Sequence, residues 1–304
     1  MSPTRLIRFI AVEDSRTYVG APILPPDLDV AQYVAASDRS PLTARVLPSD
    51  NILDASLAPT DQLRTVARLL PILPPARIPS IRALGANYVQ PGQEAREARA
   101  KRPALPILFF KPPQSCVVGH GDAIVVPKEM EHETDYEVEL VVVIGRDCKD
   151  VQVHEALSYV RGYALGNDVS ARKRMFAVPQ WGLGKGADTY FPLSSTLLLA
   201  SSSVDPESIA LQTRLNGQLM QDGNTRDHLW GVAETIAKLS EGTTLHAGTL
   251  ISMGTPPGEG FKRDPQVFLK HGDVVTISGS HGLGSLTNPV VQVTKLQVPG
   301  KAKL

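Results

Sequence analysis

Between Asp135 and Gly145 the chain alternates acidic and apolar residues and then runs through five apolar residues. Alternation at period two predicts a strand, and the β-branched run that follows indicates that this strand is buried. Glu137 and Glu139 are two residues apart, so both side chains should point to the same face of the strand. Carboxylates placed side by side repel each other and are costly to bury unpaired. The pattern therefore indicates either a site for a hard divalent cation or an exposed edge strand whose acids are solvated.

Elsewhere the pattern predicts mainly short strands joined by turns, with a hairpin at Asn216-Gly217. The strands are expected at residues 5–12, 80–88, 106–113, 135–145, 211–215, 249–253, 274–277 and 290–294. Helical spacing of apolar residues predicts helices after Thr60, from 153 and after Thr225, and a polar, exposed helix at 90–101 that begins at Pro91. Many strands with glycine turns and few helices favour a β-rich mixed α+β fold, as a β-sandwich or closed β-roll.

Proline-rich residues 71–79 are the strongest candidate for a linker in the chain. They divide the 304 residues into a small N-terminal domain, residues 1–75, and a larger catalytic domain, residues 76–304. Nothing in the first domain suggests chemistry.

Composition excludes several classes of function. Lys plus Arg and Asp plus Glu both number 31, so no basic excess would recruit nucleic acid or a membrane surface. Two cysteines make no disulfide framework, Arg5 and Arg8 interrupt the apolar residues near the start, and no apolar run reaches membrane-spanning length. We therefore expect a cytoplasmic protein.

Three further segments carry candidate chemistry. Asp168 follows an apolar strand and precedes a loop, from which a third carboxylate could reach the acidic pair. Lys185 lies in a glycine-rich stretch, residues 182–192, that lacks the spacing of a phosphate-binding loop. The turn from Gly254 to Gly258 presents backbone N–H groups and the Thr255 hydroxyl, which could hold a carboxylate.

These motifs stand in one order: Glu137-x-Glu139, Asp168-Val-Ser-Ala-Arg172, Lys185-x-x-Asp188 and Gly254-Thr-Pro-x-Gly258. Together they resemble the fumarylacetoacetate hydrolase superfamily over residues 80–295. The resemblance implies a roll of packed β-sheets with a small N-terminal domain, usually dimeric. It also implies a bound Mg²⁺, or Mn²⁺ or Ca²⁺, and a small substrate that is a 2-oxo acid or a β-diketone.

The resemblance also implies roles for individual residues. Glu137, Glu139 and Asp168 match the metal ligands, and Lys185 and Glu94 match catalytic groups. The positions that match the substrate pocket are Tyr88, Arg172, Gln180 and Thr255. A cation chelated by a 2-oxo carboxylate would stabilise an enolate, with the Lys185 ammonium nearby.

One departure bears on the reaction. Hydrolytic relatives carry Gly-x-Asn-Tyr-x-x-His-x-x-Glu, but here the histidine position is Pro91, which can accept no proton. Changes at Lys173 and Met175 accompany it. We therefore rank a lyase or tautomerase acting on oxaloacetate-like 2-oxo acids first, in the branch that resembles macrophomate synthase and oxaloacetate decarboxylases. An acylpyruvate or fumarylacetoacetate-type hydrolase that uses Glu94 alone comes second. A non-catalytic protein that binds a metal and an oxo acid comes third.

Overall fold

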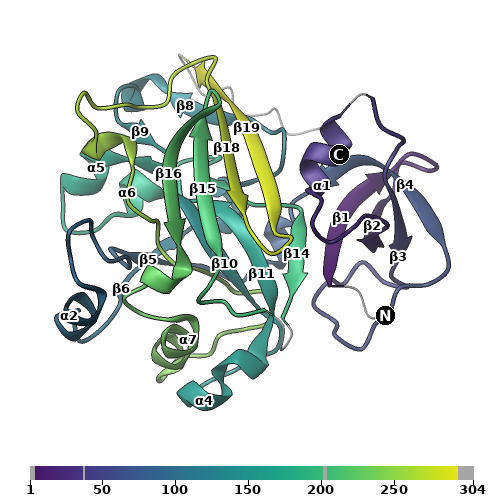
Figure 1. The fold of residues 1–304 in the computed structure, drawn as a ribbon, viewed down its shortest axis with the longest axis horizontal. Coiled ribbons are helices and arrows are strands. Elements are labelled where there is room, and N and C mark those ends of the chain that lie inside the picture. Colours follow the sequence, from purple (N-terminus) through teal and green to yellow (C-terminus); the bar gives the residue numbers. More distant parts are fainter. Residues whose placement is uncertain (1–3, 37, 201–203, 294–304) are drawn as a thin grey trace, which may run out of the picture.

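The computed structural model describes residues 4–36, 38–200 and 204–293, and strands dominate its fold (Figure 1). The largest element is a ten-stranded sheet. In spatial order its strands are β2 (Thr17–Pro22), β3 (Thr43–Val46), β4 (Leu63–Leu70), β1 (Arg5–Ala11), β14 (Thr196–Leu199), β11 (Val160–Asn167), β10 (Val138–Ile144), β17 (Leu250–Ser252), β5 (Ile81–Gly85) and β6 (Ile107–Lys111).

A second sheet of five strands packs against the centre of the first. Its strands, in spatial order, are β16 (Gln218–Asn224), β15 (Ala210–Leu215), β18 (Val274–Gly279), β19 (Gly284–Val293) and β8 (Ile124–Pro127). Two short pairs complete the described strands: β9 (Thr134–Asp135) with β12 (Ser170–Ala171), and β7 (Val117–Val118) with β13 (Phe191–Pro192). The prediction of a β-rich fold of packed sheets is confirmed.

The apolar run of strand β10 fits its position, because both faces of this strand are covered by the rest of the protein. Leu140 and Val142 belong to the core that reaches the five-stranded sheet. Val141 and Val143 point to the other face, into a core shared with β1 and β5. All seven residues of β10 are buried, as a strand at the centre of two cores requires.

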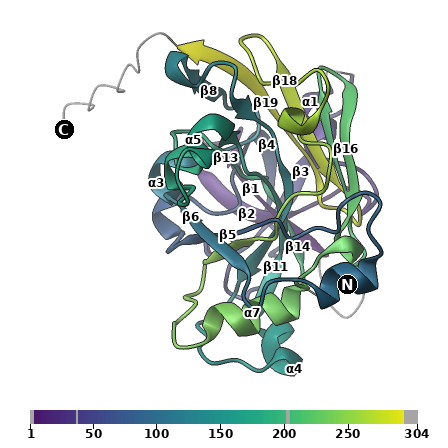
Figure 2. The same ribbon diagram turned by 90° about the vertical axis from the view of Figure 1, so that its left-hand side faces the viewer.

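Few of the described residues are helical. The helices are α1 (Val30–Ala35), α2 (Ala95–Ala100), α3 (Pro113–Cys116), α4 (Val153–Ala156), α5 (Arg172–Phe176), α6 (Gly182–Lys185) and α7 (Val232–Ser240). Short 3₁₀ turns lie at Pro75–Arg77, Lys128–Met130, Leu157–Tyr159, Thr225–Asp227 and Gly260–Lys262. Helices α4 and α7 lie together at one end of the molecule (Figure 2). No helix in the described ranges is long and apolar enough to cross a membrane.

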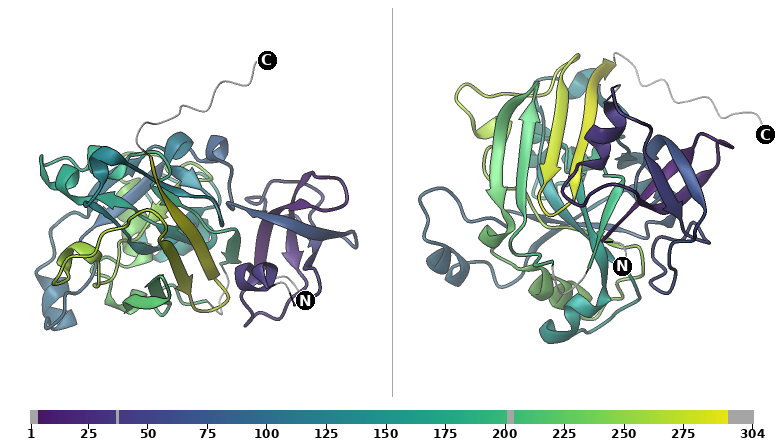
Figure 3. Two further views of the ribbon diagram at one scale, coloured as in Figure 1. Left: turned by 90° about the horizontal axis from the view of Figure 1, so that it is seen from above. Right: turned by 45° about the vertical axis from the view of Figure 1, so that its right-hand side comes forward.

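Strands β1 to β4 form a unit to one side of the main body (Figure 3). This unit has its own core, which includes Phe9, Val30 and Leu69. Strand β1 nevertheless pairs with β14, so the ten-stranded sheet continues from this unit into the rest of the chain. The domain boundary near residue 75 stays a prediction.

The helix expected after Thr60 is wrong, because this segment is strand β4. The register of β4 against β1 moves from Arg68 opposite Ile10 to Val66 opposite Ala11, so Ala67 is an extra, bulged residue. The bulge puts Val66 and Leu69 on the buried side at a spacing of three, which imitates a helix. The Thr60 hydroxyl donates to the Val46 carbonyl instead of capping a helix.

Three other helix predictions need correction. The long helix α7 starts after Gly231, and Thr225 begins only a 3₁₀ turn. The segment from Val153 is helical for seven residues and then becomes β11. The polar helix starts only at Ala95, and Pro91 lies in a preceding turn.

The hairpin prediction is confirmed. Asn216 and Gly217 have φ values of 51° and 83° and connect β15 to β16. The last predicted strand lies within β19, and its final residue, Thr294, is outside the described residues.

Candidate active site

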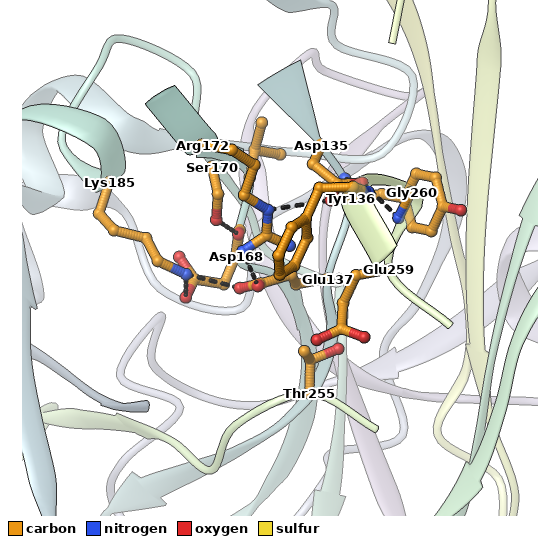
Figure 4. Close-up of polar contacts among 12 residues, drawn as sticks. Asp135, Tyr136, Glu137, Asp168, Ser170, Arg172, Lys185, Thr255, Glu259 and Gly260 are labelled. Carbon is orange, nitrogen blue, oxygen red and sulfur yellow. Dashed lines mark hydrogen bonds and ion pairs between the residues drawn. The ribbon is translucent and has the colours of Figure 1, made fainter. Parts of the chain in front are cut away.

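Strands β10 and β11 bring three carboxylates together at one end of the pair. Glu139 lies on β10 opposite Gly166, and Glu137 immediately precedes this strand. The N–H of Glu137 donates to Asn167 Oδ1 at 2.9 Å, and the N–H of Asp168 donates to the Glu137 carbonyl at 2.9 Å. One oxygen of each of Glu137, Glu139 and Asp168 lies within 4.8 Å of the others (Figure 4). The structure therefore gathers the three carboxylates predicted to hold a metal.

Three cations are buried beside these carboxylates. Lys185 Nζ donates to Glu137 Oε2 at 2.5 Å and to Asp168 Oδ2 at 2.6 Å (Figure 4). Lys111 Nζ lies 2.6 Å from the other oxygen of Asp168. Arg172 pairs through Nη1 with Glu137 at 2.6 Å and through Nε with Asp135 at 2.9 Å. Buried charges of this kind persist only when they are paired and hydrogen-bonded.

Lys185 is placed by the short helix α6, in the stretch predicted as a glycine-rich loop. Its N–H donates to the Trp181 carbonyl at 3.0 Å. A Cβ on the neighbouring Gly184 would lie 2.6 Å from the backbone nitrogen of Met175 and 2.7 Å from the Ala171 carbonyl oxygen. Glycine at 184 therefore lets α6 approach α5 closely enough to bury the lysine.

The three metal-site carboxylates differ in their electrostatic surroundings. Burial opposes the ionisation of Glu137, but Arg172 and Lys185 outweigh this effect and lower its pKa to about 2. Burial, together with the charges of Asp168 and Glu137, raises the pKa of Glu139 well above its usual range. Burial alone would lower the pKa of Lys185, but Asp168 and Glu137 raise it. Among the described residues, Glu139 is thus the one of the three that forms no ion pair, although Lys185 partly offsets the rise of its pKa.

The chemistry of this donor set fits a hard divalent cation. Glu137, Glu139 and Asp168 offer only carboxylate oxygens, which suit Mg²⁺, Mn²⁺ or Ca²⁺. Four buried carboxylates, counting Asp135, face the three cations Lys111, Arg172 and Lys185. A divalent ion would therefore also allow Glu139 to ionise.

Glu137 and Glu139 form part of the wall of a cavity of about 710 Å³. The cavity lies between the segment of residues 85–103, which carries α2, and the loop of residues 255–262. Its apolar lining comes mainly from Leu84, Ile107, Met175, Phe176, Trp181, Leu229 and Phe261. The predicted pocket residues Tyr88, Arg172 and Thr255 line it as well.

Two polar atoms at this cavity have no hydrogen-bond partner among the described residues. They are Arg172 Nη2 and the hydroxyl of Tyr88, both buried. Thr255 differs, because its hydroxyl donates to the Val138 carbonyl at 2.9 Å and accepts from Gln221 Nε2 at 2.8 Å. Arg172 Nη2 and the Tyr88 hydroxyl are therefore unused polar groups at this cavity, whereas the Thr255 hydroxyl is already engaged.

The other predicted residues lie further from the carboxylates. Glu94 lines the cavity but is exposed at the start of α2. Gln180 is exposed and is not part of the lining, so its role in binding stays a prediction. Pro91 is also exposed and outside the lining, although Gln90 and Gly92 on either side belong to it.

Sequence reasoning did not select Glu259 for the site. Its side chain is 8% exposed and lines the cavity. Figure 4 shows it with Glu137 and Thr255, which line the same cavity. The only sequence signal is an acidic residue directly after the turn of residues 254–258, which says nothing about where the side chain points.

Comparison with known proteins agrees with this geometry. Residues 80–291 match the family described as fumarylacetoacetate (FAA) hydrolase C-terminal. Caffeoylpyruvate hydrolase of Neonothopanus nambi is 37% identical over 294 residues, which cover 94% of this chain and 93% of that protein. Human oxaloacetate tautomerase FAHD2A, a mitochondrial protein, is 36% identical over 239 residues, which cover 75% and 74% of the two chains.

A solved structure shows the same fold. Fumarylacetoacetate hydrolase from Exiguobacterium antarcticum superposes with a TM-score of 0.74 and 30% identity, covering 95% of this chain and 99% of that one. The family match, the two relatives and the buried carboxylates lead to one conclusion. The chain belongs to the fumarylacetoacetate hydrolase family of enzymes.

Proposed function

We propose that the protein is a divalent-cation-dependent hydrolase that cleaves acylpyruvates with a bulky, apolar acyl group. One observation carries the proposal. Among the described residues, each of the five cations that line the cavity pairs with a carboxylate, while much of the remaining wall is aromatic or aliphatic. The pairs are Lys101–Glu97, Arg102–Glu234, Arg172–Glu137, Lys185–Asp168 and Lys262–Glu259.

This wall favours a substrate with one carboxylate and an apolar tail. A second carboxylate, as in oxaloacetate, would have to displace an existing ion pair or stay unpaired in a partly buried site. An apolar acyl group would instead lie against Trp181, Phe176 and Phe261 and lose contact with water.

The residues of the site have separate tasks in this reaction. A bound divalent cation would polarise the 2-oxo group and stabilise negative charge on its oxygen. Arg172 Nη2, which is buried without a partner, would donate to the substrate carboxylate. The Lys185 ammonium would add positive charge near the oxygen of the developing enolate.

The relative that covers nearly the whole chain supports this choice, since it is named as a hydrolase of caffeoylpyruvate. That name describes the other protein, and its bearing on this chain is part of the proposal. The hydrolase therefore moves ahead of the tautomerase, which the sequence alone ranked first. The reason is the lining of the cavity, which only the structure reveals.

Oxaloacetate tautomerisation is the second candidate. Pro91 provides no lid imidazole, and no histidine lines the cavity in the described part of the chain. Tautomerisation moves a proton without activating water. The FAHD2A relative is named for this activity.

Substrate profiles would separate the two candidates. Purified protein with Mg²⁺, Mn²⁺ or EDTA would be given an aromatic acylpyruvate, acetylpyruvate and oxaloacetate. We expect cation-dependent loss of the diketone absorbance, with the highest kcat/KM for the aromatic substrate. The Glu137→Ala variant should show no loss of absorbance. Acceleration of only the enol–keto exchange of oxaloacetate would favour the tautomerase. Tight oxalate binding with no turnover of any substrate would indicate a binding protein.

We also propose a homodimer. Strand β6 is an edge of the ten-stranded sheet and exposes Ile107, Leu108 and Phe110 beside Leu105. Long apolar edges tend to associate. Light scattering should give twice the chain mass of 32.7 kDa, and Phe110→Asp should lower it. A monomeric wild type would contradict this.

The cytoplasmic location stays a prediction.

A further inference from the structure

We propose that Glu259 is the base that moves the proton in the reaction. It would take over the role of the lid histidine, whose position in this sequence is occupied by Pro91. The inference rests on the proposed function for its substrate, and it concerns a residue outside the carboxylate triad. Five carboxylates line the cavity among the described residues: Glu94, Glu97, Glu137, Glu139 and Glu259. Their surroundings separate them into three kinds.

Glu94 and Glu97 are exposed on the segment that carries α2. Glu137 and Glu139 belong to the triad, where a cation would occupy their oxygens. Glu259 alone is both buried and outside the triad. A base needs a free lone pair at the cavity and a fixed position, and of these five carboxylates only Glu259 is buried at the cavity and outside the triad.

The backbone fixes the position of Glu259. Gly258 has a φ of 116°, and a Cβ there would lie 2.3 Å from the Met220 carbonyl oxygen. A Cβ on Gly260 would lie 1.8 Å from the Val267 carbonyl oxygen. The N–H of Gly260 also donates to Asp135 Oδ1 at 2.9 Å. Two glycines and this hydrogen bond therefore hold the loop against the segment that leads into Glu137.

The carboxylate is held by two contacts and keeps acceptor capacity. Glu259 Oε2 accepts from the Gly258 N–H at 3.1 Å, and Oε1 pairs with Lys262 Nζ at 2.9 Å. An ionised carboxylate has roughly four acceptor positions, so about half remain for water or substrate. Lys262 also donates to Gln90 Oε1 at 3.2 Å, which links this pair to the segment that leads into α2.

The proton balance of the step is complete. Glu259 takes a proton from water as the water oxygen bonds to the acyl carbon, C4. The C3–C4 bond then breaks, and its electron pair remains on C3 as the enolate of pyruvate. Protonated Glu259 returns the proton to C3 and becomes a carboxylate again. Water has thus supplied OH to the acyl carbon and H to C3, which gives a carboxylic acid and pyruvate.

The test compares Glu259→Gln, Glu94→Gln and the wild type with the same aromatic acylpyruvate. Glutamine keeps the size of the side chain and can still accept from the Gly258 N–H, but it is not a base. We expect Glu259→Gln to lower kcat by about 10²–10⁴-fold, as for other general bases. The affinities for Mg²⁺ and for oxalate, measured by calorimetry, should stay within about threefold of the wild-type values, which corresponds to about 0.7 kcal/mol. Glu259→Asp should recover part of the activity.

A second reaction keeps this inference separate from the proposed function. Exchange of the C3 protons of pyruvate with D₂O, followed by NMR, needs a base but no attack by water. If the wild type exchanges these protons without hydrolysing acylpyruvates, the proposed function is wrong and the exchange rates of the variants decide the role of Glu259. A kcat or exchange rate in Glu259→Gln within about threefold of wild type would overturn the inference. So would a large loss in Glu94→Gln alone, or a wild type that catalyses neither reaction.

Discussion

Lys185 Nζ lies 2.5 Å from Glu137 Oε2, and both side chains are almost completely buried. The same ammonium lies 2.6 Å from Asp168, so one lysine compensates two of the three carboxylates of the proposed cation site. Lys185 therefore has two tasks that can be separated by experiment. It balances charge in the cation-free protein, and it would place positive charge beside the substrate.

Lys185→Met should separate these tasks. Removal of one partner from a buried ion pair costs about 3–5 kcal/mol of the free energy of unfolding, so the cation-free variant should lose that much in urea titrations. Added Mg²⁺ should recover part of the loss, because it supplies the missing positive charge. Hydrolysis should still fall by about 10²–10³-fold. Lys173→Met, at an exposed lysine, is the control, and equal stability of the two variants would contradict the prediction.

Glu139→Gln should remove cation binding without destabilising the cation-free protein. Burial and the charges of Asp168 and Glu137 raise the pKa of Glu139, which favours its neutral form in the cation-free protein, so the amide replaces a group whose charge is already disfavoured. Ser252 and the Gly254 N–H both donate to Oε2, at 2.6 and 2.9 Å, and an amide oxygen can accept both bonds. We expect a Tm within about 2 °C of wild type without cation, and no rise in Tm when Mg²⁺ is added.

Asp168→Asn is the contrasting variant. It should also lose cation binding, but it removes the carboxylate that pairs with Lys111 and one of the two that pair with Lys185. Its Tm without cation should therefore fall well below that of Glu139→Gln. Similar Tm values for the two variants would argue against the protonated state of Glu139.

Cation binding should release a proton. Burial and the neighbouring charges of Asp168 and Glu137 favour the protonated form of Glu139 in the cation-free protein, whereas the cation needs the carboxylate. Affinity should therefore rise with pH, by up to about tenfold per unit, until it passes the raised pKa of Glu139. Calorimetry in buffers with different ionisation enthalpies measures the released proton directly. Binding that does not change with pH above the usual pKa of a glutamic acid, about 4.3, would contradict this.

The sequence was informative where a local pattern decides the outcome. The alternating residues predicted strand β10. The three carboxylates meet because β10 pairs with β11 and the Glu137 N–H donates to Asn167 Oδ1 at the end of this pair. Strand β4 was mispredicted because a single bulged residue, Ala67, changed the spacing of its buried side chains. A bulge depends on the partner strand, and the chain alone does not show that partner.

Contacts between distant segments were not predictable either. The site combines Lys111, Asp168 and Glu259, which lie far apart in the sequence. Whether a cation in the cavity is already paired depends on residues such as Glu234, more than a hundred positions away from its partner Arg102. The proposal of an apolar substrate therefore rests on the three-dimensional arrangement of the cavity wall.

Arg102 should control access to the cavity. It makes a two-pronged ion pair with Glu234, at 2.9 and 3.0 Å, and its guanidinium lies 3.8 Å from the centre of the Trp230 ring. It also donates to the Leu229 carbonyl at 2.5 Å. These contacts hold the segment that follows α2 against the loop before α7. Because Arg102 and Glu234 are partly exposed, we expect the ion pair and the cation–π contact to contribute about 1–2 kcal/mol together.

Arg102→Ala should free this segment. We expect faster amide hydrogen exchange over residues 90–102. We also expect a KM about tenfold higher with kcat changed less, because about 1.4 kcal/mol less stabilisation of the closed segment weakens the binding of substrate and transition state equally. Lys101→Ala is the matched control, since Lys101 is on the same segment and its pair with Glu97 at 3.5 Å is exposed. Unchanged exchange in Arg102→Ala would show that the segment is held by other contacts, such as the bond of Arg99 Nε to the His228 carbonyl at 3.0 Å. In that case the double variant Arg99→Ala/Arg102→Ala should show the faster amide hydrogen exchange over residues 90–102.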